Sequence, residues 1–286
     1  MQGKYESRKR GGWPLAVLIL LLTVSTLAAA ARPHGEKPAP EEEPREDPPV
    51  MVLPAELETP ESVQEEAVWT PVPESEPVED SYFDDVAFVG DSRTDGFRLY
   101  SGLNRGMYFC VTGETVASAT DMENWKTEDG GKISLADAVA AADCGKIYLM
   151  LGVNELGWNG TDLFRSHAGN LLRRLKADHP DAELVVQSLL PVSAEQDAKG
   201  SYVNNQRIRT YNQIWMELAE ENGCDYVNAA EALTGEDGCL PADFSFDGVH
   251  LNRAGCKVWL DYLRTHSVGR RPAENSEGKE PASADS

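Results

Sequence analysis

Between residues 81 and 266, short apolar segments alternate with segments whose apolar residues recur at helical spacing. A short apolar run that ends at glycine or in a polar turn is typical of a buried strand. Strands that alternate with helices favour a parallel sheet with helices packed on both faces. The predicted strands span residues 86–89, 107–111, 146–151, 183–188 and 225–228.

The segments between and after these strands carry helix signals. Ser134 and Asp137 resemble a capping box at the start of a helix. Asn252 is a suitable cap for the last helix, which follows directly. The predicted helices span residues 135–142, 163–175, 208–219 and 253–264. Residues 81–266 are therefore expected to form one α/β domain.

The first strand runs directly into Gly90-Asp91-Ser92. A tight turn at this point places Ser92 just beyond the carboxyl end of the strand, where open α/β sheets bind their ligands. If a helix starts at Ser92, its unpaired N–H groups and positive dipole end face whatever the hydroxyl attacks. The alternative interpretation is that Asp91 or Ser92 only caps that helix.

Two later stretches carry the partners that a nucleophilic serine needs. Asn154 follows the strand at residues 146–151, where its amide can donate to a developing oxyanion or serve as an ordinary turn residue. Asp247 and His250 share a short glycine-containing turn before the last helix. Their spacing lets the carboxylate accept Nδ1–H, which leaves Nε2 free as a base.

A weaker signal follows the second strand, where Gly113 stands between Thr112 and Glu114. A glycine in such a turn allows a backbone N–H to approach a ligand closely.

Taken in order, these stretches resemble the SGNH (GDSL-type) hydrolase family over nearly all of residues 81–266. The resemblance implies a three-layer α/β/α, flavodoxin-like sandwich with a five-stranded parallel sheet, and a bacterial protein that is membrane-anchored or secreted. It also implies that no cofactor or metal is needed. The implied roles are Ser92 as nucleophile, Asp247 as orienting acid and His250 as base, with Ser92, Gly113 and Asn154 forming the oxyanion hole.

The chain departs from the family pattern at two points. Arg93 and Thr94 follow the serine where the family name places leucine. Glu155 follows Asn154 where the family has aspartate, a change that we expect to alter turn packing rather than chemistry.

A serine, a histidine with its carboxylate and an amide donor are the parts of acyl transfer. The order of these residues, without a G-x-S-x-G elbow, argues against an ordinary α/β-hydrolase. We therefore expect a serine esterase in which water releases the acyl group from Ser92. The alternatives are an O-acyltransferase that uses a sugar hydroxyl instead of water, and a non-catalytic surface-binding module.

The substrate is only indirectly indicated. No long apolar insertion suggests a lipase lid, which favours a short acyl group such as acetyl on a cell-envelope carbohydrate. Trp158 is expected either to stack on a sugar ring or to pack in the core. The polar residues 193–207 are expected to form part of the rim of the site.

The first ten residues are basic, and residues 11–31 carry no charge. This pattern is an export signal, either a cleaved signal peptide or a membrane anchor. We favour the anchor, because the uncharged stretch is long enough to span a bilayer. Both interpretations place the remaining chain outside the cytoplasm.

Residues 32–80 are expected to form a disordered stalk. From Pro33 to Asp80 there are 11 prolines and 15 acidic residues against two basic ones. Such a segment buries too little apolar surface to order itself. Residues 267–286 are expected to be disordered as well. We therefore predict that residues 1–80 are dispensable for folding.

Charge and cysteine content exclude other classes of protein. The net charge is −22, and no basic face for nucleic acid is visible. The five cysteines form no C-x-x-C pair and no zinc-like spacing with histidine, so we expect most of them to be small apolar fillers. The expected partners are a small ester or acylated glycan and, through the N-terminal segment, a membrane.

Overall fold

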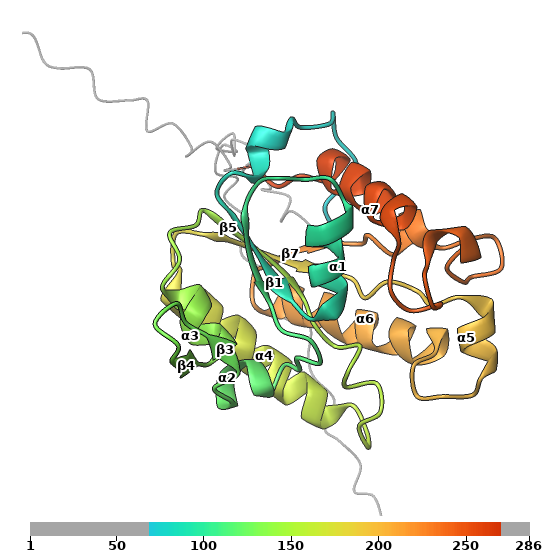
Figure 1. Ribbon diagram of the computed structural model, residues 1–286, viewed down its shortest axis with the longest axis horizontal. Helices are drawn as coiled ribbons and strands as arrows, with labels where there is room; N and C mark the ends of the chain where they lie inside the picture. The colour runs from blue at the N-terminus through green and yellow to red at the C-terminus, as the bar shows by residue number, and fades with distance from the viewer. Residues whose placement is uncertain (1–68, 270–286) are drawn as a thin grey trace, which may run out of the picture. The chain divides into compact units, whose positions relative to one another are not determined.

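Five strands form one parallel sheet in the computed structural model, which describes residues 69–269 (Figure 1). The order across the sheet is β2-β1-β5-β6-β7, and every neighbouring pair is parallel. This arrangement confirms the predicted sheet. The strands are β1 (Val86–Gly90), β2 (Met107–Cys110), β5 (Lys146–Met150), β6 (Glu183–Gln187) and β7 (Asp225–Val227).

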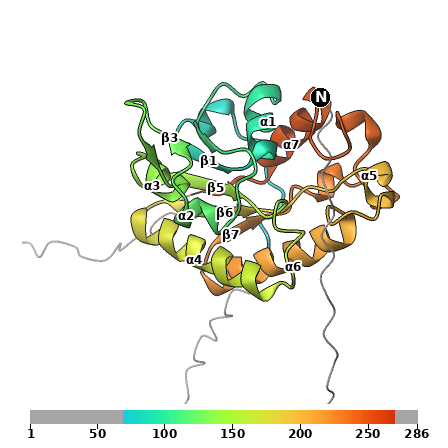
Figure 2. The same ribbon diagram turned by 60° about the horizontal axis from the view of Figure 1, so that its bottom comes forward.

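Helices cover both faces of this sheet (Figures 1 and 2). The helices α1 and α7 lie on one face, and α3, α4 and α6 lie on the other. The predicted three-layer α/β/α sandwich is therefore confirmed. The helix bounds are α1 (Ser92–Tyr100), α3 (Leu135–Ala140), α4 (Asp162–Asp178), α6 (Asn205–Glu221) and α7 (Arg253–Thr265).

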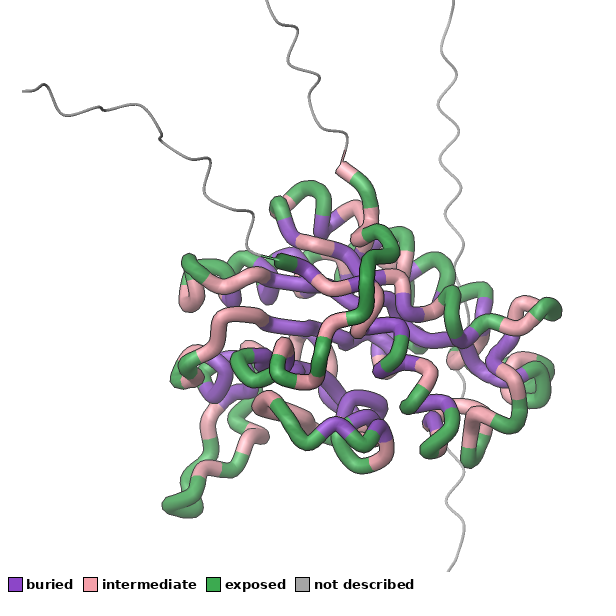
Figure 3. The backbone as a smooth tube through the Cα atoms, turned by 90° about the horizontal axis from the view of Figure 1, so that it is seen from above, coloured by how far each residue is buried: buried purple, intermediate pink, exposed green. Residues whose placement is uncertain are grey.

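The core lies between these layers, and the buried residues gather in the interior of the domain (Figure 3). The strands β1, β5, β6 and β7 are buried for most of their length, whereas the edge strand β2 is only partly buried. On one face Phe97 of α1 packs against Trp259 of α7, with ring centroids 4.6 Å apart. On the other face Phe164 of α4 packs against Trp215 of α6. Burial on both faces explains why the strands are continuous apolar runs in the sequence.

Local capping explains where the helices begin. The Ser134 hydroxyl accepts the Asp137 N–H at 3.0 Å, as the capping box predicts. The Asn252 side chain accepts the N–H groups of Ala254 and Gly255 at the start of α7. These bonds satisfy donors that have no partner inside the helix.

Several short elements lie outside the sequence prediction. An antiparallel ribbon of β3 and β4 and the short helix α2 lie between β2 and α3, and α5 follows β6. Each is too short to produce a periodic pattern. Their bounds are α2 (Ser118–Asp121), β3 (Trp125–Lys126), β4 (Lys132–Ile133) and α5 (Ala194–Ala198), and 3₁₀ turns span Asp80–Phe83, Glu231–Leu233 and Ala242–Phe244.

Residues 69–78, here called the N-terminal segment, pack against the domain. Within this segment, Val72 N–H donates to the carbonyl of Tyr226 at 2.9 Å, on the free edge of β7. Its Trp69 and Val78 contact the core, and the Trp69 indole donates to the carbonyl of Cys224. An edge strand leaves backbone groups unpaired, and this segment satisfies part of them. The domain boundary predicted at Ser81 therefore lies too late.

The C-terminal boundary also needs extension. Val268 is buried, and its carbonyl oxygen accepts a hydrogen bond from the Tyr82 hydroxyl at 2.7 Å. The folded domain therefore continues beyond the predicted end at His266. The expected anchor at residues 11–31, most of the stalk and most of the tail lie outside the described residues. Within residues 69–269, no helix is long and apolar enough to cross a bilayer.

Removing the N-terminal segment is expected to destabilise the domain, contrary to the prediction from sequence. A variant that lacks residues 1–80 should have a Tm about 5–10 °C below that of a variant lacking residues 1–63. The reason is that it loses several hydrogen bonds, each worth about 1 kcal/mol, together with the Trp69 contacts. Differential scanning calorimetry measures the difference. Equal Tm values would show that the segment contributes nothing to the fold.

Candidate active site

The carboxyl end of β1 turns sharply into α1. A Cβ on Gly90 would lie 2.1 Å from Thr94 Oγ1 and 2.7 Å from the carbonyl oxygen of Met150, so only glycine fits. The Asp91 carboxylate caps α1 by accepting the Arg93 N–H at 2.8 Å. Asp91 thus has the capping role considered above, and the Ser92 hydroxyl is available for another contact.

That contact is with the turn before α7. Ser92 Oγ lies 3.0 Å from His250 Nε2, and His250 Nδ1 lies 2.8 Å from Asp247 Oδ2. The fold therefore joins the three residues that the sequence indicated into one line of hydrogen bonds. This is the arrangement in which a histidine can take a proton from a serine.

The turn itself orients the acid. Asp247 Oδ1 accepts the N–H groups of Val249 and His250 at 2.9 and 2.8 Å. Partial burial raises the pKa of Asp247, but hydrogen bonds from the His250 N–H, the His250 ring and the Val249 N–H outweigh it and lower that pKa to about 2. The carboxylate is therefore ionised at neutral pH and accepts Nδ1–H, which leaves Nε2 as the acceptor that faces Ser92.

Asn154 lies beside the turn that carries Ser92, because the strand that precedes it, β5, pairs with β1. Its Nδ2 donates to the carbonyl of Glu114 at 2.7 Å and, over a longer 3.3 Å, to Asp91 Oδ2. Asp91 directly precedes Ser92. The structure therefore brings the predicted amide donor to the nucleophile's turn.

Gly113 lies in the turn after β2, with a φ of 78° that favours glycine. The turn is closed by a hydrogen bond from the Glu114 N–H to the carbonyl of Val111. Its next residue, Glu114, makes the contact with Asn154. Gly113 is thus adjacent in the chain to the residue that contacts Asn154, and its own role as an oxyanion donor stays a prediction.

Trp158 lies away from the line of hydrogen bonds formed by Ser92, His250 and Asp247, here called the catalytic line. Its ring meets His167 of α4 edge-on at 6.1 Å. It also lines a small cavity together with Arg207 and Tyr211 of α6. Among the described contacts of Trp158, none is with Ser92, Asp247 or His250. These contacts agree with the packing alternative for Trp158.

Two buried charged residues, Asp91 and Arg93, flank Ser92 in the sequence, and their burial was not predicted. Arg93 is 3% exposed and donates through Nη1 to the carbonyl of Leu190 at 2.7 Å. Burial lowers the pKa of Arg93 to about 10 and raises the pKa of Asp91 to about 6. The only sequence signal was that Arg93 stands where the family has leucine.

A second buried carboxyl, that of Glu155, follows Asn154. Glu155 is fully buried, and its Oε1 accepts the Val116 N–H at 2.6 Å. Burial raises its pKa to about 8; the Val116 hydrogen bond lowers the value, and the charges of Asp91 and Glu114 raise it. The sequence signal for this buried carboxyl was the glutamate at position 155, where the family motif has aspartate.

Other reactive groups in the described region lie apart from this site. All five cysteines are free, and burial raises the pKa of Cys110 and of Cys256 to about 12, which makes both poor nucleophiles. Within residues 69–269, no group of histidine, cysteine and carboxylate side chains is arranged to hold a metal ion.

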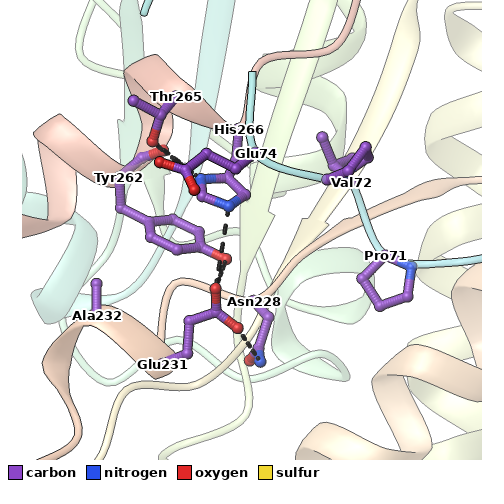
Figure 4. A pocket seen from close by; sticks show the side chains of 10 residues that line it. Pro71, Val72, Glu74, Asn228, Glu231, Ala232, Tyr262, Thr265 and His266 are labelled. Carbon is purple, nitrogen blue, oxygen red and sulfur yellow. Dashed lines mark hydrogen bonds and ion pairs between the residues drawn. The ribbon is translucent and has the colours of Figure 1, made fainter. Parts of the chain in front are cut away.

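A cavity of about 590 Å³ lies at the other end of α7, between the N-terminal segment and residues 228–232 (Figure 4). In it the Tyr262 hydroxyl donates to Glu231 Oε1 at 2.8 Å, and the Tyr262 and His266 rings stack. His250 lies three residues before the start of α7, and the cavity lies at the end of this 13-residue helix. The cavity is therefore about 20 Å along the helix from the catalytic line. Several of its polar groups pair with one another, and nothing in it points to a ligand.

A serine, a histidine and an acid aligned at the carboxyl edge of an α/β/α sandwich define a serine ester hydrolase. A model of the GDSL-like lipase/acylhydrolase family matches residues 88–258, which include Ser92, Asn154, Asp247 and His250. The chain belongs to this family.

Several solved structures are similar to the chain at low identity. A protein from Streptococcus pneumonia is 23% identical, with a TM-score of 0.48, over 63% of this chain and 81% of its own. The acetyl xylan esterase AlAXEase is 17% identical, with a TM-score of 0.47, over 62% and 96%. The periplasmic domain of a lipopolysaccharide acetyltransferase from Salmonella Paratyphi A is 15% identical, with a TM-score of 0.46, over 63% and 82%. A search of curated proteins returned no match.

Proposed function

We propose that the protein is an extracytoplasmic serine esterase that removes a short acyl group, most simply acetyl, from a cell-envelope carbohydrate. One observation carries the catalytic part: the line from Ser92 Oγ through the His250 ring to Asp247, with contacts of 3.0 and 2.8 Å. Water is the acyl acceptor in this proposal.

The reaction has two halves. His250 Nε2 takes the Ser92 proton as Oγ attacks the ester carbonyl, and the tetrahedral intermediate expels the alcohol, which receives that proton from His250. His250 then takes a proton from water as the water oxygen attacks the acyl-enzyme, and it returns that proton to Ser92 Oγ when the intermediate collapses and releases the acid. Asp247 stabilises the imidazolium in both halves.

The oxyanion hole of this proposal consists of the N–H groups of Ser92 and Gly113 and the Asn154 amide. Ser92 N–H belongs to the first turn of α1, where the helix dipole favours negative charge. The Asn154 N–H directed at Asp91 makes the longer of its two bonds, so it is the one that we assign to the oxyanion.

Exposure of the catalytic turn supports a large polar alcohol part with a short acyl group. The side chains of His250 and Asp247 are 44% and 54% exposed. A cavity of about 410 Å³ beside Asp247 is lined by polar residues, among them Ser193, Glu195 and Asp237, and by apolar residues that include Leu240 and Phe246. Its position agrees with the predicted role of residues 193–207 in the rim. The basic start and uncharged stretch of the chain support export.

Acyl-chain length tests this proposal. The kcat/KM for p-nitrophenyl esters should be highest for acetate and fall at least tenfold by octanoate, because the exposed side chains of Asp247 and His250 leave little apolar surface to hold a long chain. Acetylated oligosaccharides should release acetate into water. A preference for octanoate would contradict a short acyl pocket, and transfer of acetyl to an added sugar in place of water would identify an acyltransferase.

Removing the Asn154 amide should act mainly on the transition state, both directly and by loosening the Gly113 turn that Asn154 holds through the Glu114 carbonyl. We expect Asn154→Ala to lower kcat by about two to three orders of magnitude with KM nearly unchanged. Steady-state kinetics on p-nitrophenyl acetate measure both constants, and Asn170→Ala on the exposed side of α4 is the matched control. Wild-type kcat in Asn154→Ala would refute the oxyanion role.

A further inference from the structure

The turn that carries Gly113 is held from two sides by consecutive residues. Asn154 Nδ2 donates to the carbonyl of Glu114 at 2.7 Å. The next side chain, Glu155, accepts the Val116 N–H through Oε1 at 2.6 Å. Residues 111–117 form neither helix nor strand, so these two bonds supply order that regular secondary structure does not. One bond holds Glu114, the residue after Gly113, and the other holds Val116, two residues further on.

The surroundings of Glu155 make an ionised carboxyl costly. Glu155 is 0% exposed, and its Oε2 has no hydrogen-bond partner. Burial, with the nearby charges of Asp91 and Glu114, raises its pKa to about 8, although the Val116 bond lowers it. At neutral pH the carboxyl is therefore mostly protonated.

The titratable and charged groups around Glu155 come from several elements. From α6, the Tyr211 hydroxyl donates to the Glu155 carbonyl at 2.8 Å, and Arg207 donates to the carbonyl of Leu156. Asp91 lies at the end of β1, and the Glu114 side chain accepts from Ser118 and Asn124. The two carboxyl groups among these neighbours, those of Asp91 and Glu114, both raise the pKa of Glu155 and so disfavour its ionisation.

We propose that Glu155 is a positioning residue: as a neutral carboxylic acid it holds the Gly113 turn against Asn154 and keeps negative charge away from the oxyanion hole. This inference rests on the proposed esterase reaction. Aspartate, which the family pattern has here, is one methylene shorter and would not reach the Val116 N–H from the same backbone position. An ionised Glu155 would repel the oxyanion that forms beside Asn154.

Three substitutions separate the length of the side chain from its charge. Glu155→Ala and Glu155→Asp should lower kcat about 10- to 100-fold with KM changed less than threefold, because the acceptor for Val116 is lost or withdrawn. Glu155→Gln keeps the acceptor without the charge, and we expect it to recover at least tenfold of the kcat lost in Glu155→Ala. Equal kcat in Glu155→Ala and the wild type would overturn the positioning role.

The pH profile tests the neutral state. Wild-type kcat should fall as the pH rises through about 8, where Glu155 ionises, and Glu155→Gln should not show that fall. Folding raises the pKa of Glu155 from about 4.3, its value in the unfolded chain. The neutral carboxyl therefore stabilises the fold fully below about pH 4.3, and this stabilisation is lost as the pH rises to about 8. The Tm of the wild type relative to Glu155→Gln should decline over the same window.

The outcomes distinguish this inference from the proposed function. An alkaline fall that persists in Glu155→Gln, or a Tm difference that does not change with pH, would overturn the neutral acid. A wild-type protein that hydrolyses no ester would instead overturn the proposed function, and the Tm comparison would still decide the protonation state of Glu155.

Discussion

Replacement of Ser92 by alanine is expected to lower kcat by about six orders of magnitude, to the level that binding and the oxyanion hole alone provide. The reason is that Ser92 Oγ is the group within hydrogen-bond reach of His250 Nε2, at 3.0 Å, and no acyl-enzyme forms without it. Hydrolysis of p-nitrophenyl acetate measures the loss. A serine-directed phosphonate should label the wild type at Ser92 and leave Ser92→Ala unlabelled.

The fold should survive this change. The cap of α1 comes from Asp91 and not from the serine hydroxyl, so Ser92→Ala should keep its Tm within a few degrees of the wild type. Ser166→Ala, on the exposed side of α4, is the matched control and should keep full activity. Phosphonate labelling of another serine, or normal turnover by Ser92→Ala, would remove Ser92 from the mechanism.

Replacement of Asp247 by asparagine is expected to lower kcat by about four orders of magnitude. An asparagine amide can donate to Nδ1, which favours the tautomer with its proton on Nε2, and that nitrogen then cannot accept the Ser92 proton. The measurement is kcat for p-nitrophenyl acetate across the pH range. Because the pKa of Asp247 is about 2, its own titration should set no limb of the wild-type profile above pH 4.

Asp181→Asn makes the same chemical change at an exposed position before β6. This position is at the amino ends of the strands, whereas Ser92 is at their carboxyl ends. It should leave kcat and its pH dependence as in the wild type. A folded Asp247→Asn protein with more than a tenth of wild-type kcat would show that the acid does not orient His250.

The sequence alone determined the strands, most of the long helices and the side chains that meet at the candidate active site. Periodicity reports which residues are buried, and a parallel sheet makes every strand of the core a continuous apolar run. Ser92 and Asn154 were found because each directly follows such a run, and parallel strands present their carboxyl ends at one edge. Asp247 and His250 were found because their pairing is local, within one turn.

Only the tertiary structure decided the features that depend on contacts between distant parts of the chain. The N-terminal segment looks like part of the stalk by composition, yet it packs on β7, because β7 is an edge strand with backbone groups to satisfy. Trp158 lies against α4 and α6, a contact that no local pattern encodes. The pKa values of Asp91 and Glu155 are raised because packing removes water around them, and desolvation is a property of the assembled fold rather than of the sequence near each carboxyl.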